Sequence, residues 1–371
     1  MSYPFDSIWI NQRKVLLDAI LQGQVNTTSE HEASTFTFIR AWLKGEDSFT
    51  LQTSGSTGPP KNITFTRNQM QASAARTVKA LGLEQGITSL VCLNTKYIAG
   101  KMMLVRALEH GLKIIAVDPA SDPYQQISAS QTIDFMAVAP LQLQTLLDNP
   151  KYFSRLNSMK AILVGGAPVN LRLKTAISSL TCPVLETYGM TETLSNIALK
   201  HLNGAMTSVY FTPLPGITLS HDNRDCLIIH DSIQHEPLIT NDVVELHENG
   251  FRWLGRADNV INSGGLKIYP EKVESALENV FQSLEIPRKY FIGSLPDERL
   301  GEAVTLFIEG SDISKSDILR LQKGIDQLPE KLERPRKAAT IAAFQYTPTG
   351  KIIRKRIPEG NIRLITEFVT H

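Results

Sequence analysis

Residues 161–193 read AILVGGAPVNLRLKTAISSLTCPVLETYGMTET, and this stretch decides the fold that the sequence predicts. An apolar run typical of a buried strand opens it at 161–164, and a second strand-like run follows at 184–187. The residues between them, 171–179, have a helical pattern. A strand, a helix and a second strand at this spacing indicate a βαβ unit with parallel strands.

The same alternation continues toward the N-terminus. Further strand-like runs lie at 90–93, 113–117 and 135–139. Helix-like segments lie at 34–44, 100–110, 123–130 and 140–147. We therefore predict an α/β fold whose large N-terminal domain is built on a mostly parallel sheet.

The pattern changes after residue 205. Short antiparallel strands are expected at 226–230, 243–247 and 251–254, and later a strand at 304–309 and a helix at 315–328. Gly264 and Gly265 indicate a hairpin turn, and Pro270 begins a helix. The sequence thus predicts two domains, residues 1–257 with the parallel sheet plus antiparallel strands, and residues 258–371 as a small α+β domain.

Composition bounds the class of protein. The chain has 371 residues, 42% of them hydrophobic and 20% charged, and its net charge of +1 favours neither nucleic acid nor an anionic membrane as partner. Its three cysteines are too far apart for a paired-cysteine zinc site. No signal-peptide pattern or bilayer-length apolar run is present, so we expect a cytoplasmic protein without membrane insertion.

Residues 53–61, TSGSTGPPK, combine glycines, hydroxyls and a lysine between two strand-like flanks. Glycines let backbone N–H groups turn toward an anion, and Lys61 adds positive charge, so the segment predicts a phosphate-binding loop. It is not a Walker A loop, because Pro60 replaces the glycine before the lysine and Asn62 replaces the Ser/Thr after it. The alternative is a flexible surface linker.

Two loops are expected where strands of the parallel sheet end, which is where such sheets bind ligands. The first, 165–168, has side chains small enough to admit a flat ligand. The second, 188–193, offers an aromatic ring, hydroxyls and a carboxylate. The alternatives are a core aromatic for Tyr188 and a helix-start acid for Glu192.

Four segments of the sequence resemble motifs of a known enzyme superfamily. TSGSTGPPK (53–61), YGMTET (188–193), GRADNVINSGGLKIYPEKVE (255–274) and TPTGK (347–351) occur in the order seen in acyl-adenylate-forming, or AMP-binding, enzymes. The resemblance spans most of the chain. Within this superfamily, YGMTETLSNIAL and FRWLGRADNVINSGGLKIYPEKVE look most like the o-succinylbenzoate–CoA ligases of menaquinone biosynthesis.

The resemblance implies an ATP-dependent ligase that uses Mg²⁺. A carboxylic acid reacts with ATP to give acyl-AMP and pyrophosphate, and the thiol of coenzyme A then displaces AMP. Thr191 would contact the α-phosphate, and Glu192 would bind the metal. The residues implied at the β- and γ-phosphates are Thr53, Ser54, Gly55, Ser56, Thr57, Gly58 and Lys61.

The resemblance also implies a nucleoside site. Gly165, Gly166, Ala167, Tyr188 and Gly189 would surround the adenine. Asp242 and Arg256 would take the ribose, although Asn241 stands where the family has glycine.

Lys351 corresponds to the family lysine that bridges the reacting carboxylate and the α-phosphate. The alternative is a solvated cation in the basic run 351–356. Asp258 resembles the hinge about which the mobile small domain, carrying Lys351, rotates between the two half-reactions.

The acid itself is left open. Tyr97 stands where relatives that use aryl acids have histidine. Five residues are candidates for holding a second carboxylate of the substrate: Lys96, Lys101, Ser195, Asn196 and Lys200. The alternatives are another aryl or fatty acid, acyl loading of a carrier protein, or a catalytically silent nucleotide-binding protein. A homodimer is left open too.

Overall fold

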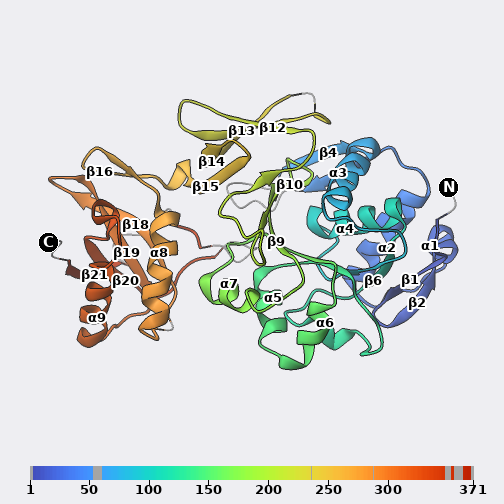
Figure 1. The fold of residues 1–371 in the computed structure, drawn as a ribbon, viewed down its shortest axis with the longest axis horizontal. Helices are drawn as coiled ribbons and strands as arrows, with labels where there is room; N and C mark the ends of the chain where they lie inside the picture. The colour runs from blue at the N-terminus through green and yellow to red at the C-terminus, as the bar shows by residue number, and fades with distance from the viewer. Residues whose placement is uncertain are drawn as a thin grey trace. The chain divides into compact units, whose positions relative to one another are not determined.

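The computed structural model describes residues 3–52, 61–234, 236–286, 288–346, 352–354 and 362–368 (Figure 1). The chain divides into two compact units. Unit 1 contains Met1–Leu219, Ile229–Leu238 and His247–Phe251, and unit 2 contains Ser220–Ile228, Ile239–Leu246 and Arg252–His371. No helix within the described ranges is long and apolar enough to cross a membrane.

The centre of unit 1 is a nine-stranded sheet of order β11-β10-β9-β8-β7-β5-β6-β1-β2. Its parallel strands are β5 (Thr88–Val91), β6 (Lys113–Ala116), β7 (Phe135–Val138), β8 (Ala161–Val164) and β9 (Val184–Met190). β1 (Ser7–Ile10) is also parallel to β6, and β10 (Ser195–His201) is antiparallel to β9. The two edge strands, β2 (Arg13–Leu16) and β11 (Thr212–Pro213), pair antiparallel with β1 and β10. The predicted α/β fold with a parallel sheet is confirmed.

Helices cross between the parallel strands. Helices α4 (Ile98–His110), α5 (Pro140–Leu147) and α7 (Leu171–Ile177) were predicted, whereas α6 (Phe153–Asn157) was not. The helix expected at 123–130 is wrong, because only the 3₁₀ turn Pro123–Gln126 forms there. Beyond it, the Ser128 hydroxyl meets Ser130 Oγ at 2.9 Å, and such local side-chain bonds compete with a helix.

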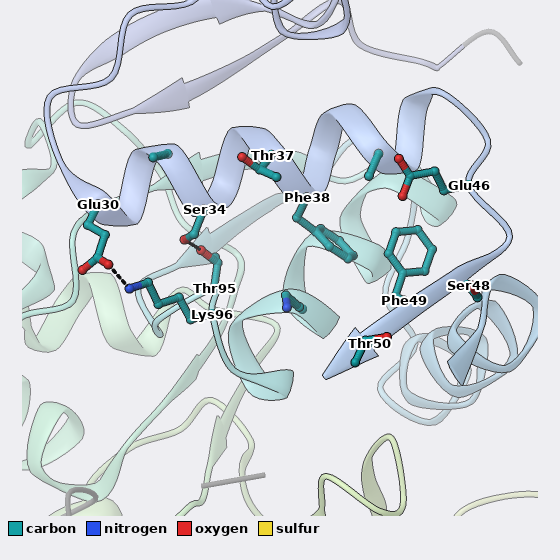
Figure 2. Close-up of a pocket in the computed structure, with 13 residues that line it drawn as sticks. Glu30, Ser34, Thr37, Phe38, Glu46, Ser48, Phe49, Thr50, Thr95 and Lys96 are labelled. Atoms are coloured by element: carbon teal, nitrogen blue, oxygen red, sulfur yellow. Dashed lines mark hydrogen bonds and ion pairs between the residues drawn. The ribbon is translucent and has the colours of Figure 1, made fainter. Parts of the chain in front are cut away.

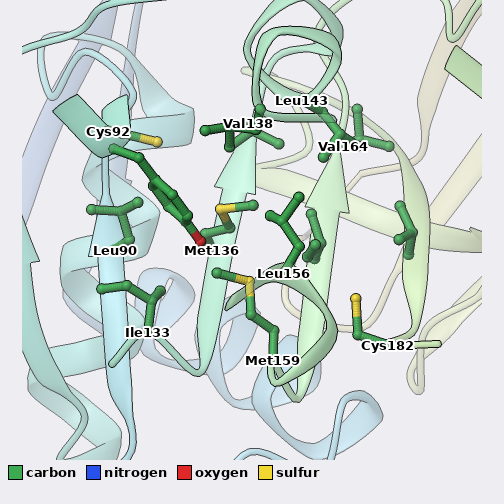
Figure 3. Close-up of a cluster of buried hydrophobic side chains, with 14 of the residues drawn as sticks. Leu90, Cys92, Ile133, Met136, Val138, Leu143, Leu156, Met159, Val164 and Cys182 are labelled. Carbon is green, nitrogen blue, oxygen red and sulfur yellow. The ribbon is translucent and has the colours of Figure 1, made fainter. Parts of the chain in front are cut away.

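A cluster of buried side chains fills one side of this sheet (Figure 3). Leu90, Met136 and Val164 from the strands meet Leu143 of α5 and Leu156 of α6. Strands covered on their faces read as continuous apolar runs, which is why their positions could be predicted.

The three cysteines of the chain are free and buried. Cys92 and Cys182 lie in this cluster, whereas Cys226 belongs to unit 2. Burial raises the pKa of the Cys92 thiol to about 12 and that of Cys182 to about 11.

The N-terminal part of unit 1 adds two helices and a hairpin. Helix α1 spans Leu17–Gln22, and α2 spans Glu30–Leu43, which overlaps the helix predicted at 34–44 except for its last residue. The α2 start was missed: Ser29 caps it by accepting a hydrogen bond from the Glu32 backbone. Strands β3 (Ser48–Gln52) and β4 (Asn62–Thr66) pair antiparallel and lead into α3 (Arg67–Ala80).

The strands predicted after residue 205 are present. The first three belong to a sheet of order β12-β13-β14-β15, formed by β12 (Ile217–His221), β13 (Cys226–Asp231), β14 (Leu238–His247) and β15 (Gly250–Arg256). The short 3₁₀ helix η3 (Ala257–Asn259) follows β15. The predicted domain boundary at residue 258 therefore falls within η3, and it stays a prediction.

Unit 2 contains a second sheet of order β17-β16-β19-β20-β21, with β18 also pairing with β19. Its strands are β16 (Ile261–Ser263), β17 (Leu266–Ile268), β18 (Tyr290–Asp297), β19 (Gly301–Glu309), β20 (Lys337–Ile341) and β21 (Ile362–Glu367). The predicted turn joins β16 to β17, where Gly264 and Gly265 have φ of 59° and 82°. Helices α8 (Pro270–Ser283) and α9 (Lys315–Ile325) pack their apolar faces on this sheet.

Candidate active site

The predicted phosphate loop is anchored on the β3–β4 hairpin. Gln52 and Asn62 are directly paired, so the two ends of the intervening segment are held side by side. Thr50 and Thr64 join their hydroxyls across the strands at 3.0 Å. The six residues Thr53 to Gly58 lie outside the described residues, and their phosphate contacts stay a prediction, as does that of Lys61.

At the carboxyl end of β8, two glycines follow at positions where a side chain is unfavourable. A Cβ on Gly165 would lie 2.0 Å from Thr187 Oγ1 of the neighbouring strand β9. Gly166 has a φ of 84°, a backbone angle that is unfavourable for residues with a Cβ atom. Gly166 and Ala167 are exposed, so the small-residue segment predicted to contact the adenine does reach the surface.

Strand β9 continues through Tyr188, Gly189 and Met190, which the sequence assigned to a loop. That assignment is wrong because β10 pairs antiparallel with this stretch, with Tyr188 opposite Ala198 and Met190 opposite Ser195. A Cβ on Gly189 would lie 2.1 Å from the Ser195 carbonyl oxygen. Glycine therefore permits the close approach of the two backbones.

Tyr188 lies in an aromatic cluster of unit 1. Its ring meets Phe251 edge-on at 4.9 Å and Phe211 at 5.8 Å, and the latter two rings stack at 5.4 Å. Tyr188 is 9% exposed. The core-aromatic alternative thus describes its packing, and its contact with adenine stays a prediction.

A strained turn carries Thr191 and Glu192 between β9 and β10. Leu194 and Ser195 have φ of 59° and 110°, which are rare for residues with a side chain. The Thr193 hydroxyl accepts a hydrogen bond from the Met190 N–H and donates to the Ser195 carbonyl, both at 2.8 Å. This network fixes the backbone beneath the two predicted catalytic side chains.

No helix starts at Glu192, so the helix-start alternative is wrong. The Glu192 carbonyl instead accepts a hydrogen bond from Gln234 Nε2 at 2.9 Å. Because β8 and β9 are parallel neighbours, Thr191 and Glu192 emerge at the same sheet edge as Gly165.

Sequence reasoning missed Arg106, which is 2% exposed inside α4. Its Nη2 donates to Asn196 Oδ1 at 2.7 Å and to Ser195 Oγ at 2.9 Å, and it lies 3.4 Å from Thr77 Oγ1. Burial lowers the pKa of the guanidinium to about 10, so it stays charged at neutral pH. The sequence feature that could have revealed Arg106 is its position as a charged residue within the otherwise apolar helical run Met102–Leu108.

Replacing Arg106 with methionine should reduce the free energy of unfolding by about 2 to 3 kcal/mol, because it leaves Ser195 and Asn196 without their buried donor. Urea unfolding measures the loss. Arg172→Met is the control, since Arg172 makes an exposed ion pair with Asp148 and should cost less than about 0.5 kcal/mol. Equal losses in the two variants would contradict the role given to Arg106.

In unit 2, the two residues predicted at the ribose are in contact. Arg256 Nη1 lies 3.3 Å from Asp242 Oδ1, and its Nη2 lies 3.0 Å from Asp258 Oδ2. The Thr240 hydroxyl accepts from the Asp242 N–H at 3.1 Å. One guanidinium thus joins the predicted ribose carboxylate to the predicted hinge residue.

The first turns of α8 carry two carboxylates, Glu271 and Glu274, that face Arg354. Burial raises the pKa of the Glu274 carboxyl to about 7, although Arg354 opposes the rise. The folded protein therefore holds this proton more tightly than the unfolded chain does. The resulting stability is present below the ordinary pKa of 4.5 and is lost as the pH rises through 7.

Glu274→Gln fixes the neutral form. From pH 4.5 to pH 8, the free energy of unfolding of the variant should therefore rise by about 1 to 3 kcal/mol relative to wild type. Urea unfolding at both pH values tests this, with the exposed Glu298→Gln as control. A difference between variant and wild type that stays constant with pH would count against a raised Glu274 pKa.

A groove of about 500 Å³ lies in unit 1 between α2, β3 and the segment before α4 (Figure 2). Phe38, Phe49 and Thr50 line it, so the strand that leads into the predicted phosphate loop forms one wall. Lys96 at its rim pairs with Glu30. Lys101 lies 5.9 Å from the Phe38 ring, and burial lowers the pKa of its ammonium.

Comparison with known proteins now bears on this site. A family model described as AMP-binding enzyme matches residues 10–220. The chain is 41% identical to a solved acyl-CoA synthetase (AMP-forming)/AMP-acid ligase II-like protein from Dyadobacter fermentans DSM 18053, covering 90% of this chain and 95% of that one, with a TM-score of 0.61. The chain belongs to the AMP-binding enzyme family.

Other members of the AMP-binding enzyme family are more distant. A 2-succinylbenzoate–CoA ligase from Bacillus mycoides (strain KBAB4) is 27% identical over 355 residues, covering 86% of this chain and 72% of that protein. The o-succinylbenzoate coenzyme A synthetase from Bacillus subtilis, solved in complex with ATP and a magnesium ion, is 21% identical with a TM-score of 0.68, covering 83% of this chain and 69% of that one. This last likeness concerns the fold.

The AMP-binding family match contains the strand ends of unit 1 and the β3–β4 hairpin. Asp242, Arg256 and Lys351 lie beyond residue 220, and the longer alignment with the Bacillus ligase covers more of the chain than the family model does. Membership in the AMP-binding enzyme family thus rests chiefly on unit 1.

Proposed function

We propose that this protein is an ATP-dependent acid–CoA ligase whose carboxylic acid is o-succinylbenzoate. The observation that carries the proposal is the strained turn of Thr191 and Glu192, which follows β9 at the same end of the sheet as the glycines after β8, in a chain of the AMP-binding family. Strain in a turn at a sheet's ligand-binding edge is characteristic of functional sites.

The first half-reaction joins the acid to the α-phosphate and releases pyrophosphate. All reactants are anionic, so the protein must supply positive charge and hydrogen-bond donors rather than covalent chemistry. The Thr191 hydroxyl donates to an α-phosphate oxygen. The segment from Thr53 to Lys61, held at its base by the Gln52–Asn62 pair, surrounds the outer phosphates.

Glu192 is the residue that would hold Mg²⁺. Within the described part of the chain, no group of three or more His, Cys, Asp or Glu could hold a metal by itself. A single carboxylate suits Mg²⁺, which binds through few carboxylates, water and phosphate. When bound, the metal neutralises charge on the phosphates.

Lys351 bridges the acid and the α-phosphate during this step. The thiol of coenzyme A then attacks the acyl carbon, and AMP leaves. We assign the hinge between the two steps to Asp258, with residues 1–257 binding ATP and the acid and residues 258–371 carrying Lys351. Asp258 is the central residue of η3, a short 3₁₀ connector between β15 and β16, and hinges are commonly found in such connecting segments.

Among the five candidate residues for the second carboxylate of the substrate, we favour Lys101, because the other four have partners within the protein. Lys200 pairs with Glu186 at 2.7 Å, and Lys96 pairs with Glu30. Ser195 and Asn196 are bound by Arg106. The Lys101 ammonium faces an aromatic ring in the groove instead, and a substrate carboxylate would compensate its burial.

The test uses purified protein with ATP, Mg²⁺, coenzyme A and a panel of acids: o-succinylbenzoate, benzoate and an aliphatic acid. Pyrophosphate release and mass spectrometry of the thioester are measured. We expect o-succinylbenzoyl-CoA as the preferred product. Thioester from another acid would keep the reaction and replace the substrate, and no pyrophosphate with any acid would overturn the proposal.

A further inference from the structure

The flanks of the segment that carries Lys351 are tied together. Tyr346 and Ile352 form an antiparallel bridge, and the Ile353 N–H donates to the Gln345 carbonyl at 2.8 Å. On the near side, the Tyr346 hydroxyl lies 3.2 Å from Glu309 Oε1 and 3.1 Å from Lys289 Nζ. The chain before the segment is therefore fastened to β19.

On the C-terminal side of this segment, Arg354 contacts α8 and holds the chain against it. Its Nη2 donates to Glu274 Oε2 at 2.8 Å, and its Nη1 lies 2.8 Å from Glu274 Oε1. The Nη2 contact is a hydrogen bond, whereas the Nη1 contact is an ion pair without hydrogen-bond geometry. Together they hold the guanidinium against the Glu274 carboxylate. The Arg354 side chain is 23% exposed and that of Glu274 19%, so solvent screens the pair only in part.

Glu274 is itself held in place. Its Oε1 accepts from the Ile292 backbone N–H at 2.7 Å, and the Tyr290 hydroxyl donates to its carbonyl at 3.1 Å. Strand β18 therefore sets the carboxylate that receives Arg354.

A second carboxylate extends this contact toward η3. Glu271 Oε1 lies 3.6 Å from Arg354 Nη1 and accepts from Asn259 Nδ2 at 2.6 Å. A Cβ on Gly255 would lie 2.4 Å from Glu271 Oε2, so the backbone before η3 packs closely on the same carboxylate. Arg354 thus belongs to a rigid frame of α8, β18 and η3.

We propose that Arg354 is a positioning residue for Lys351, acting through its paired contact with Glu274. Arg354 follows Lys351 by three positions, and the described residues Ile352 and Ile353 link the two. In this proposal, holding Arg354 in place limits the reach of the lysine. The inference rests on the proposed function, since it takes Lys351 to act in acyl-AMP formation. The Arg354 side chain points to α8, and its effect on the reaction is therefore indirect.

The experiment compares Arg354→Met, Arg354→Lys, Lys351→Ala and the double variant Lys351→Ala/Arg354→Met in the full chain. Acyl-AMP formation and thioester formation from supplied acyl-AMP are assayed separately. Arg363→Met is the matched control, because Arg363 forms an exposed ion pair with Asp312 in the same unit. Thermal unfolding of every variant reports its stability.

We expect Arg354→Met to lower kcat of acyl-AMP formation by about 10- to 100-fold, as small misplacements of reacting groups do, with KM for ATP and acid nearly unchanged. Thioester formation from acyl-AMP should fall less than about threefold, and Arg354→Lys should recover part of kcat. The double variant should be no slower than Lys351→Ala, because Arg354 acts through that lysine.

Two outcomes would overturn the inference while leaving the proposed function intact. One is wild-type acyl-AMP formation in a folded Arg354→Met variant when Lys351→Ala is inactive. The other is an equal loss in both half-reactions together with lower stability, which indicates a purely structural residue. If Lys351→Ala itself leaves acyl-AMP formation unchanged, the proposed role of the lysine fails first.

Discussion

Replacing Lys351 with alanine is expected to lower the rate of acyl-AMP formation by about two to three orders of magnitude. The reason is electrostatic: two anionic groups must approach, and a positioned cation stabilises the charge that develops between them. Thioester formation from supplied acyl-AMP should change far less, because in acyl-AMP the bond between the acid and the α-phosphate has already formed.

Pyrophosphate release measures the first step, and coenzyme A consumption with synthetic acyl-AMP measures the second. Lys315→Ala is the control, since Lys315 is exposed at the start of α9 in the same unit. Equal losses in both steps would refute a role confined to acyl-AMP formation. Unchanged rates would favour the alternative that Lys351 is a solvated cation of the basic run 351–356.

The second large effect is expected at Gly189. An alanine Cβ there would lie 2.1 Å from a backbone oxygen, that of Ser195, which cannot move without separating β9 from β10. We expect Gly189→Ala to reduce the free energy of unfolding by about 3 kcal/mol. Acyl-AMP formation should fall as well, because Thr191 and Glu192 follow directly on this strand.

Gly82→Ala separates this steric effect from backbone strain. Gly82 has a φ of 59° but nothing within 4 Å of the added Cβ, so alanine there should cost only about 1 kcal/mol. Urea unfolding of both variants gives the comparison. Similar stabilities would mean that the strand pair relaxes around the added carbon, and that glycine is not required at 189.

The parallel sheet could be predicted because its signal is local. Residues 161–164 coincide with β8, since a strand buried on both faces consists of apolar residues alone. The end of β9 could not be predicted in the same way. Tyr188 and Gly189 resemble a loop until the distant residues Ser195 to Ala198 pair with them.

In the candidate site too, residues in local motifs could be predicted, whereas contacts between residues far apart in the sequence could not. The family segments gave the positions of Thr191, Glu192, Asp242 and Arg256, and the structure shows the latter two in contact. Arg106 could not be found this way, because its partners Ser195 and Asn196 lie about ninety residues further along the chain. The β1–β2 edge of the sheet was missed as well, since short edge strands carry little pattern.

The burial of every cysteine has a practical consequence. Cys92 and Cys182 lie in unit 1 and Cys226 in unit 2, and desolvation keeps all three as unreactive thiols. A maleimide reagent can therefore modify the native chain only when part of it opens. Labelling followed by peptide mass spectrometry would time the opening of each unit separately, with no engineered probe. The three native cysteines therefore serve as reporters of the rate at which each unit opens.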